Sequence, residues 1–322
     1  MEYTPLGRTG LKAGVAALGC GGNARLGLQR GKSEEDAIAL VRHALDRGVN
    51  LLDGAAAYKT EHVIGKAVKR YDRDKLILTT RCNPAASGEL RPVEDIVESL
   101  DGSLRELGQD YVDVFFFHGV PPKFYAVVRD RMAPVLQREQ EKVKFRFLGI
   151  TETPPNDPIQ EMASQAAQDD IWDVMMIGFH MLNQTPRMRL LPHTIKNNIG
   201  TLVMFVVRNI FSVPGRLQEE IRRKVDEGKL PDWLAKEKDP LGFLVHEGGA
   251  KNLIDAAYRY ARHEPGCDVI LFGTSSIEHL EHNIESILRP PLPEAECARL
   301  AELFGEVEGM GLDVPNRNQK PG

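Results

Sequence analysis

The segment NLLDGAAAYKTEHVIGKAV, residues 50–68, contains the unit from which the fold can be derived. Its apolar start predicts a short buried strand that stops at Asp53. Tyr58 follows in a loop, and a segment with helical periodicity begins just after it. The segment therefore predicts a strand, a loop and a helix, with a carboxylate and a phenol near the carboxyl end of the strand.

This unit recurs along the chain, because short apolar runs rich in β-branched residues alternate with helix-period segments. Eight runs are expected to be strands: VAALG (15–19), NLLD (50–53), LILTT (76–80), VDVFFFH (112–118), FRFLGI (145–150), WDVMMIG (172–178), TLVMFVV (201–207) and DVILFG (268–273). Such continuous hydrophobic strands are typical of parallel sheets covered by helices. Without a break in composition, eight alternations favour one α/β domain, a (β/α)8 TIM barrel, over a doubly wound sheet in two domains.

Start and stop signals support the helices. Ser33 can cap the segment that follows it, with Asp36 at the third helical position, and Gly48 ends that segment. Pro92 suits the first turn of the next long helix, which Gly108 closes. We expect the barrel to occupy residues 1–304, with a long excursion at about 208–250 that acts as a lid, and a C-terminal tail at 305–322.

Composition narrows the class of protein. The 322 residues are 42% hydrophobic and 27% charged, with a net charge of −5 and no long basic run. These values favour a soluble globular protein with a small-molecule partner over a nucleic-acid or membrane-surface protein. The four cysteines form no C-x-x-C pair, so we expect neither a metal site nor a disulfide scaffold. The N-terminus lacks the pattern of a signal peptide, which favours a cytoplasmic location.

Four polar residues fall at the carboxyl ends of consecutive predicted strands, where a barrel of this type places its active site: Asp53, Tyr58, Arg81 and His118. Each alone has an ordinary structural explanation. A lone aspartate caps a loop, a lone tyrosine lies at a rim, a lone histidine is hydrogen-bonded in a core, and a lone arginine is a surface cation. The occurrence of all four residues together near the ends of consecutive strands favours a functional site.

These residues and several longer motifs resemble the aldo-keto reductase family. The motifs are LGRTGL (6–11), LLDGAAAY (51–58) with EHVIG (61–65), SLRELGQDYVDVFFFH (103–118) and GTSSIEHLEHNI (273–284). The resemblance covers nearly the whole chain and implies a barrel that transfers a hydride from a nicotinamide cofactor to an aldehyde or ketone. The family carries a lysine where this chain has Arg81.

The resemblance implies a role for each of the four residues. Tyr58 would donate a proton to the substrate oxygen. Arg81, held by Asp53, would supply the cation that stabilises the phenolate, because an unassisted phenol loses its proton only near pH 10. His118 would orient the substrate carbonyl. Since an arginine stays protonated, it would not relay protons as a lysine can.

No G-x-G-x-x-G motif follows a predicted strand, so the sequence gives no support for a Rossmann site. Instead, Ser275 with Glu278 predicts a capping box that opens a helix, and a helix N-terminus favours phosphate. The resemblance implies a cofactor site formed by Thr151, Glu152, Met204, Phe205, Arg208, Gly273, Thr274, Ser275, Ser276, His279 and Asn283. The expected cofactor is NADP, with NAD possible, and the alternative is a capped barrel helix with no ligand.

A second reading of the whole chain is a nicotinamide-binding sensor or regulatory protein of the same fold with little turnover. Several positions that contact nicotinamide in the family differ here: Thr151 and Glu152 replace Ser-Asn, and Met176 replaces Gln. The sequence specifies neither the substrate nor the oligomeric state.

Overall fold

The computed structural model describes residues 1–22 and 24–312. In this part of the chain eight parallel strands close into a barrel, which confirms the predicted (β/α)8 fold. In barrel order the strands are β10 (Val174–Gly178), β11 (Gly200–Met204), β12 (Val269–Phe272), β3 (Ala16–Gly19), β4 (Leu51–Asp53), β5 (Ile77–Cys82), β8 (Val112–Phe117) and β9 (Phe145–Thr151). Each predicted run overlaps one of these strands, and β5 and β9 extend one or two residues beyond their predicted ends.

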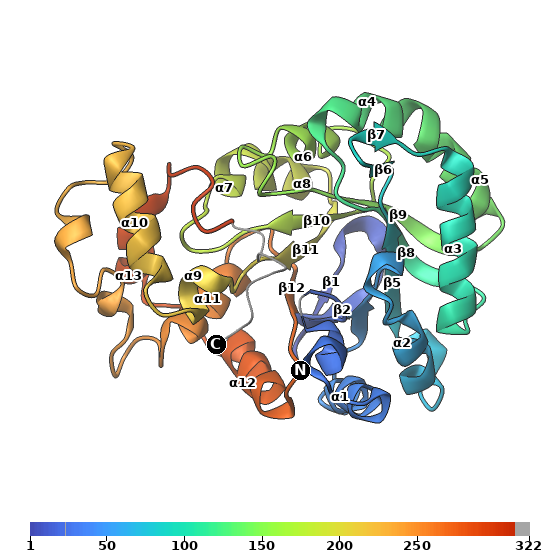
Figure 1. Cartoon of the computed structure of the whole chain (residues 1–322), viewed down its shortest axis with the longest axis horizontal. Helices are drawn as coiled ribbons and strands as arrows, with labels where there is room; N and C mark the ends of the chain where they lie inside the picture. Colours follow the sequence, from blue (N-terminus) through green and yellow to red (C-terminus); the bar gives the residue numbers. More distant parts are fainter. Residues whose placement is uncertain (23, 313–322) are drawn as a thin grey trace.

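Helices surround the barrel (Figure 1). They are α1 (Glu34–Asp46), α2 (Glu61–Val68), α3 (Val93–Leu107), α4 (Tyr125–Val127), α5 (Ala133–Glu141), α6 (Glu161–Ala166), α7 (Pro186–Arg189), α8 (Leu191–Lys196), α9 (Asn209–Ser212), α10 (Arg216–Asp226), α11 (Leu253–Arg262), α12 (Ile277–Leu288) and α13 (Glu294–Phe304). Two small hairpins, β1 (Tyr3–Pro5) with β2 (Lys12–Gly14) and β6 (Ala85–Ala86) with β7 (Glu89–Leu90), lie outside the barrel sheet. No helix among the described residues is long and apolar enough to cross a membrane.

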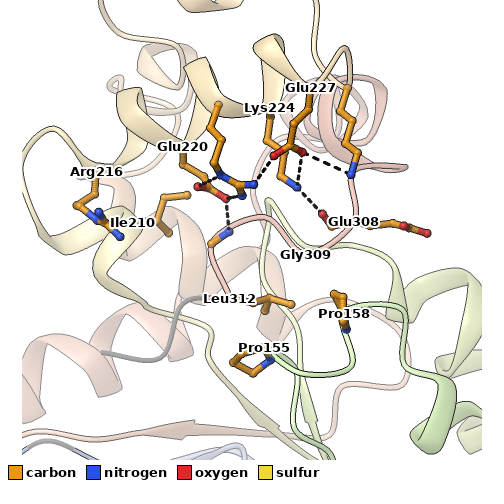
Figure 2. Close-up of a pocket in the computed structure, with 13 residues that line it drawn as sticks. Pro155, Pro158, Ile210, Arg216, Glu220, Lys224, Glu227, Glu308, Gly309 and Leu312 are labelled. Carbon is orange, nitrogen blue, oxygen red and sulfur yellow. Dashed lines mark hydrogen bonds and ion pairs between the residues drawn. The ribbon is translucent and has the colours of Figure 1, made fainter. Parts of the chain in front are cut away.

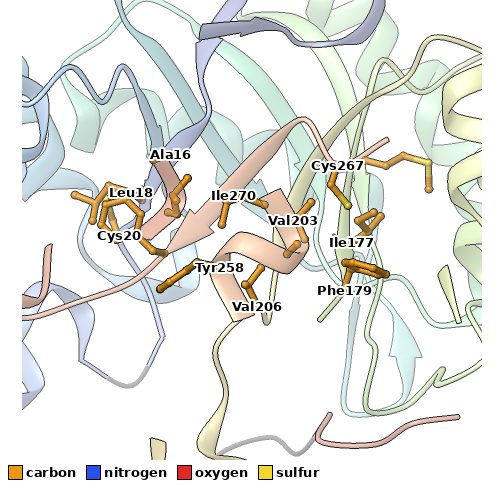
Figure 3. Packing of buried hydrophobic residues seen from close by; sticks show 14 of the residues in the cluster. Ala16, Leu18, Cys20, Ile177, Phe179, Val203, Val206, Tyr258, Cys267 and Ile270 are labelled. Carbon is orange, nitrogen blue, oxygen red and sulfur yellow. Dashed lines mark hydrogen bonds between the residues drawn. The ribbon is translucent and has the colours of Figure 1, made fainter. Parts of the chain in front are cut away.

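Alternate residues of each strand face opposite sides of the sheet and build two hydrophobic clusters. One fills the barrel interior with residues such as Leu51, Val114 and Met176. The other lies between strands and helices, and Figure 3 shows part of it, with Leu18 of β3, Ile270 of β12 and Tyr258 of α11. Because most residues on both faces of these strands are buried, the strands are mainly apolar, and their polar residues include Asp53 at the end of β4 and Arg81 near the end of β5.

The helix signals are confirmed at α1 and at the end of α3, whereas Pro92 is the N-cap of α3 rather than part of its first turn, and the cap of α12 is corrected. Ser33 Oγ accepts from the Asp36 amide, and the Asp36 carboxylate accepts from the Ser33 amide, which completes the capping box. Gly108 ends α3 in the left-handed conformation, at φ 61°.

The predicted cap at Ser275 with Glu278 is wrong by one residue. Ser276 adopts the extended conformation of an N-cap, and its hydroxyl accepts from the amide of His279. The Thr274 hydroxyl accepts from the Ser276 amide and so fixes the turn that places the cap there.

The long connection after β11 carries α9 and α10, followed by the 3-10 turns Leu234–Lys236 and Gly242–Leu244. After α13 the chain returns to α10, where the Lys224 amine donates to the Glu308 carbonyl at 2.8 Å. Both segments lie together at one end of the molecule (Figure 1). Val307, Met310 and Leu312 are buried there. Residues 313–322 of the predicted tail lie outside the described residues.

Candidate active site

The alternation along the strands brings the predicted catalytic residues to one end of the barrel interior. Leu51 faces the interior, so Asp53, two residues later, faces it as well. The same argument leads from Ile77 to Arg81 on β5 and from Phe116 to His118 after β8. These residues lie at the carboxyl ends of their strands, where barrel enzymes place their chemistry.

Arg81 connects Asp53 to Tyr58. Its Nη1 and Nη2 atoms donate to the two carboxylate oxygens of Asp53 at 2.9 and 2.8 Å. Nη2 also donates to the Tyr58 hydroxyl oxygen at 2.5 Å. One planar guanidinium therefore holds the carboxylate bidentately and reaches the phenol from the same edge.

The pair of Arg81 and Asp53 is buried, with side-chain exposures of 5% and 3%. Burial acts to lower the pKa of Arg81, but Asp53 and Tyr58 more than offset it and raise that pKa. Arg81 is therefore a permanent cation in this site. Removal of either partner would leave an uncompensated buried charge, which typically costs about 3–5 kcal/mol.

His118 lies beside the phenol. Its ring centroid is 6.0 Å from that of Tyr58, in an edge-on arrangement. Burial, with a smaller effect of the Arg81 charge, lowers the pKa of His118 to about 3. The imidazole is therefore neutral at physiological pH. Its Nδ1 atom is buried and has no hydrogen-bond partner among the described residues.

Two further residues shape this site, and sequence reasoning missed both. The Thr79 hydroxyl donates to Asp53 at 3.0 Å and so fixes the carboxylate from the neighbouring strand. Gly21 lies against the ring of Tyr58, since a Cβ atom at residue 21 would come within 2.2 Å of it. Thr79 was detectable from its position two residues before Arg81 on the same strand face. No local pattern indicated the contact with Gly21.

Thr151 is the last residue of β9 and Glu152 follows it, and their surroundings differ. The Thr151 hydroxyl accepts from the amide of Gly119, the residue after His118, at 2.6 Å. Glu152 is buried, with only 3% of the residue exposed. Its Oε1 atom accepts a hydrogen bond from the Gly178 amide at 2.5 Å, whereas Oε2 has no partner among the described residues. Burial, with a smaller effect of Asp157, raises the pKa of Glu152 to about 8.

The residues that follow β11 form another part of the expected cofactor site. Met204 packs against the interior cluster, which contains Met176. The sulfur of Met176 lies 2.7 Å from Arg81 Nη1. Phe205 has a φ of 67°, a strained conformation for a bulky residue and a frequent feature of functional sites. The guanidinium of Arg208 lies 4.1 Å from the centroid of its ring.

The start of α12 gathers hydroxyl groups. Thr274 and Ser275 are mostly buried, at 8% exposure each, and Ser276 caps the helix. Arg30 Nη1 approaches the Ser275 hydroxyl at 3.4 Å, a contact that the sequence did not indicate because 245 residues separate the two. Gly273 precedes this group, whereas His279 and Asn283 lie on α12 itself. The expected cofactor residues thus form separate groups after β9, after β11 and at α12.

Comparison with known proteins gives a consistent result. The model of the Aldo/keto reductase family matches residues 17–304. The chain is 27% identical over 304 residues to aldo-keto reductase YhdN of Bacillus subtilis, with 87% of each chain covered. It is 25% identical over 322 residues to L-galactose dehydrogenase of Arabidopsis thaliana, covering 98% of this chain and 96% of that protein.

Among solved structures, the fold resembles aldo-keto reductase AKR11C1 from Bacillus halodurans in its holo form, with a TM-score of 0.70 and 20% identity. That match covers 94% of this chain and 96% of the other. The thermostable aldo-keto reductase Tm1743 matches with a TM-score of 0.66 and 19% identity, covering 94% of this chain and 99% of that one. Both likenesses support the barrel fold.

Proposed function

The chain belongs to the aldo/keto reductase family, and on that premise we propose that it transfers a hydride from a nicotinamide cofactor, NADPH rather than NADH, to an aldehyde or ketone. The observation that carries the proposal is the contact of Arg81 with both Asp53 and Tyr58. In this contact the carboxylate of Asp53 fixes the guanidinium of Arg81, which lies against the hydroxyl group of Tyr58.

The direction of the hydrogen bonds suits proton donation by Tyr58. Arg81 donates to the phenol oxygen, so the phenol keeps its own hydrogen for another acceptor. A carbonyl oxygen that receives negative charge is such an acceptor, and Arg81 then stabilises the phenolate that remains. Neutral His118, next to the phenol, is suited to orient the carbonyl without adding charge. Tyr58 is half-buried, so solvent can return its proton.

The residues present fit a dinucleotide. When bound, the cofactor supplies the hydride. The hydroxyls and free amides at the start of α12, with Arg30 beside Ser275, suit a phosphate. Glu152, with an unpartnered buried oxygen, suits the amide end of a nicotinamide. Arg30 favours NADPH, because an added cation near the adenosine end would pair with the phosphate that NADH lacks.

One specific observation favours the alternative function, a nicotinamide-binding sensor or regulatory protein with little turnover. Arg81 stands where the family carries lysine, and its bidentate pair with Asp53 leaves it permanently protonated. A site of this kind binds the cofactor and stabilises a phenolate, but it lacks the proton relay of a lysine. Under this reading turnover is slow on every carbonyl compound. Assignment to the cytoplasm likewise stays a prediction from the sequence.

Two measurements test the proposal. Fluorescence titration with NADPH and NADH measures cofactor binding, and we expect tighter binding of NADPH. Rates of NADPH oxidation with a panel of aldehydes and ketones then separate a reductase from a sensor. Saturable NADPH binding without reduction of any carbonyl would favour the sensor, whereas absence of binding to either cofactor would refute both readings.

A further inference from the structure

A cavity lies between the loop after β9 and the excursion that carries α10. Its volume is about 610 Å³, within the range of small-molecule sites. Three segments enclose it: the loop after β9, the excursion with α10, and the chain after α13. The residues that line it include none of the four predicted catalytic residues and none of those at the start of α12.

The cavity has an apolar side and a charged side. Figure 2 shows Pro155, Pro158 and Leu312 on one side, and Glu220, Lys224 and Glu227 of the α10 region on the other. A ligand that fills both sides needs an apolar body and a charged group. The sign of that charge follows from the ion pairs in the cavity wall.

Among the described residues on the charged side of the cavity, cations outnumber the carboxylates with which they pair. Arg223 pairs with Glu220 and Glu227, while Lys224 and Lys229 lie 3.4 and 3.5 Å from the same Glu227 carboxylate. Three cations therefore share two carboxylates. The remaining acid of the lining, Glu308, directs its carboxylate to Arg189 at 2.7 Å, and Arg216 of the lining pairs with Glu219 at 3.0 Å.

Lys224 is the centre of this excess. Its side chain is only 4% exposed, and its amine donates to the Glu308 carbonyl at 2.8 Å. Burial, followed by the charge of Arg223, lowers the pKa of this amine. An anion near Lys224 would offset the destabilisation of its charged form by burial and by Arg223, because an opposite charge stabilises a buried ammonium group.

We propose that this cavity is a second ligand site, which takes a small organic carboxylate with an apolar body. The carboxylate lies near Lys224 and Arg223, and the body packs against Pro155, Pro158 and Leu312. An occupant would contact all three enclosing segments and so tie the excursion to the loop after β9. That loop also carries Thr153, which lies against Gly119, the neighbour of His118.

The test uses naphthoate as the probe and naphthamide, its uncharged analogue, as the ligand control. Calorimetric titration of the full chain should show naphthoate binding at least about tenfold more tightly than naphthamide. Lys224→Met removes the cation, and Pro155→Trp fills the cavity without a change of charge. Each should weaken naphthoate binding at least about tenfold. Lys75→Met, at a side chain that is 81% exposed, should leave it unchanged.

Hydrogen exchange locates the probe, and we expect naphthoate to slow exchange in residues 216–226 and 308–312. If Lys224→Met melts well below the wild type, Pro155→Trp decides the outcome. The proposal is overturned by an absence of saturable binding up to about 10 mM, by wild-type affinity in the folded variants, or by slowed exchange confined to residues 53–58. These results are independent of carbonyl reduction, so the proposed function and this site can fail separately.

Discussion

Arg81 Nη2 lies 2.5 Å from the hydroxyl oxygen of Tyr58 and donates to it, while the same guanidinium holds both oxygens of Asp53. The phenol oxygen thus accepts from Arg81, and under the proposed function its hydrogen would be donated to the substrate. Under the proposed function, Arg81 would supply the positive charge of the family's lysine, but it would not transfer protons, because an arginine stays protonated.

The first prediction concerns this contact. Arg81→Lys should keep carbonyl reduction or raise it, because lysine restores a smaller cation that can also exchange protons. Tyr58→Phe should lower the rate by about 10²–10⁴-fold, since it removes the proton donor, while cofactor affinity stays nearly unchanged. Steady-state rates at saturating cofactor measure both effects.

Arg81→Ala completes this series and should lower the rate strongly. It also leaves Asp53 buried without its partner, so its melting temperature must be measured alongside the rate. A Tyr58→Phe protein as active as the wild type would remove the phenol from the mechanism.

The second prediction is that Gly21→Ala displaces Tyr58. A methyl group at this residue would lie 2.2 Å from the ring, so the ring or the backbone must shift, and the contact of the phenol with Arg81 would be disturbed. We expect at least about a tenfold loss of turnover, because small misplacements of reacting groups are costly. Gly19→Ala is the matched control, since its added atom would have a contact of 3.5 Å, an ordinary one. Equal activity of the two variants would contradict this role of Gly21.

The third prediction concerns pH and Glu152. Its pKa is about 8 in the folded protein, against an ordinary value of 4.5. Between these values the unfolded chain has lost the proton that the folded protein keeps, so this group lowers stability as pH rises through that window. Glu152→Gln should reduce the fall of the unfolding free energy with pH, and it should raise that free energy at pH 8 by on the order of 1–3 kcal/mol. Denaturant unfolding at several pH values measures it, and parallel pH profiles for both proteins would exclude Glu152 as the source.

The fourth prediction locates the adenosine end of the cofactor. Replacement of Ser275, Ser276 and His279 together by alanine should weaken NADPH binding at least tenfold, about 1.4 kcal/mol. Arg30→Met should weaken NADPH more than NADH, because it removes a cation near Ser275. Fluorescence titration with both cofactors provides the comparison. Wild-type affinity in the triple variant would place the phosphate elsewhere.

The fifth prediction is that residues 208 to about 250 act as a lid. Addition of NADPH should slow hydrogen exchange in this segment, because ordering over a ligand raises the free energy of local opening. Residues 34–46 of α1, on the outside of the barrel, serve as the internal control. Exchange that is unchanged throughout the excursion would leave it without a role in cofactor retention.

Local patterns in the sequence determined the barrel. Runs such as VDVFFFH required burial on both strand faces, and the alternation with helices left few arrangements that provide it. The same logic placed Asp53, Arg81 and His118 at strand ends, because strand boundaries are visible in the hydrophobic pattern. The family motifs added the expected roles. The cap of α12 was misplaced by one residue, since neighbouring serines offer the same local signal.

Only the tertiary structure decided how these residues meet. The bond from Arg81 to Tyr58, the fit of Gly21 against the phenol ring and the approach of Arg30 to Ser275 each join segments that are distant in sequence. The same holds for the cavity beside Lys224, which exists because the excursion and the chain after α13 pack against each other. Periodicity specifies which face of an element is buried, but contacts of this kind depend on barrel closure and on loop conformations that no local pattern encodes.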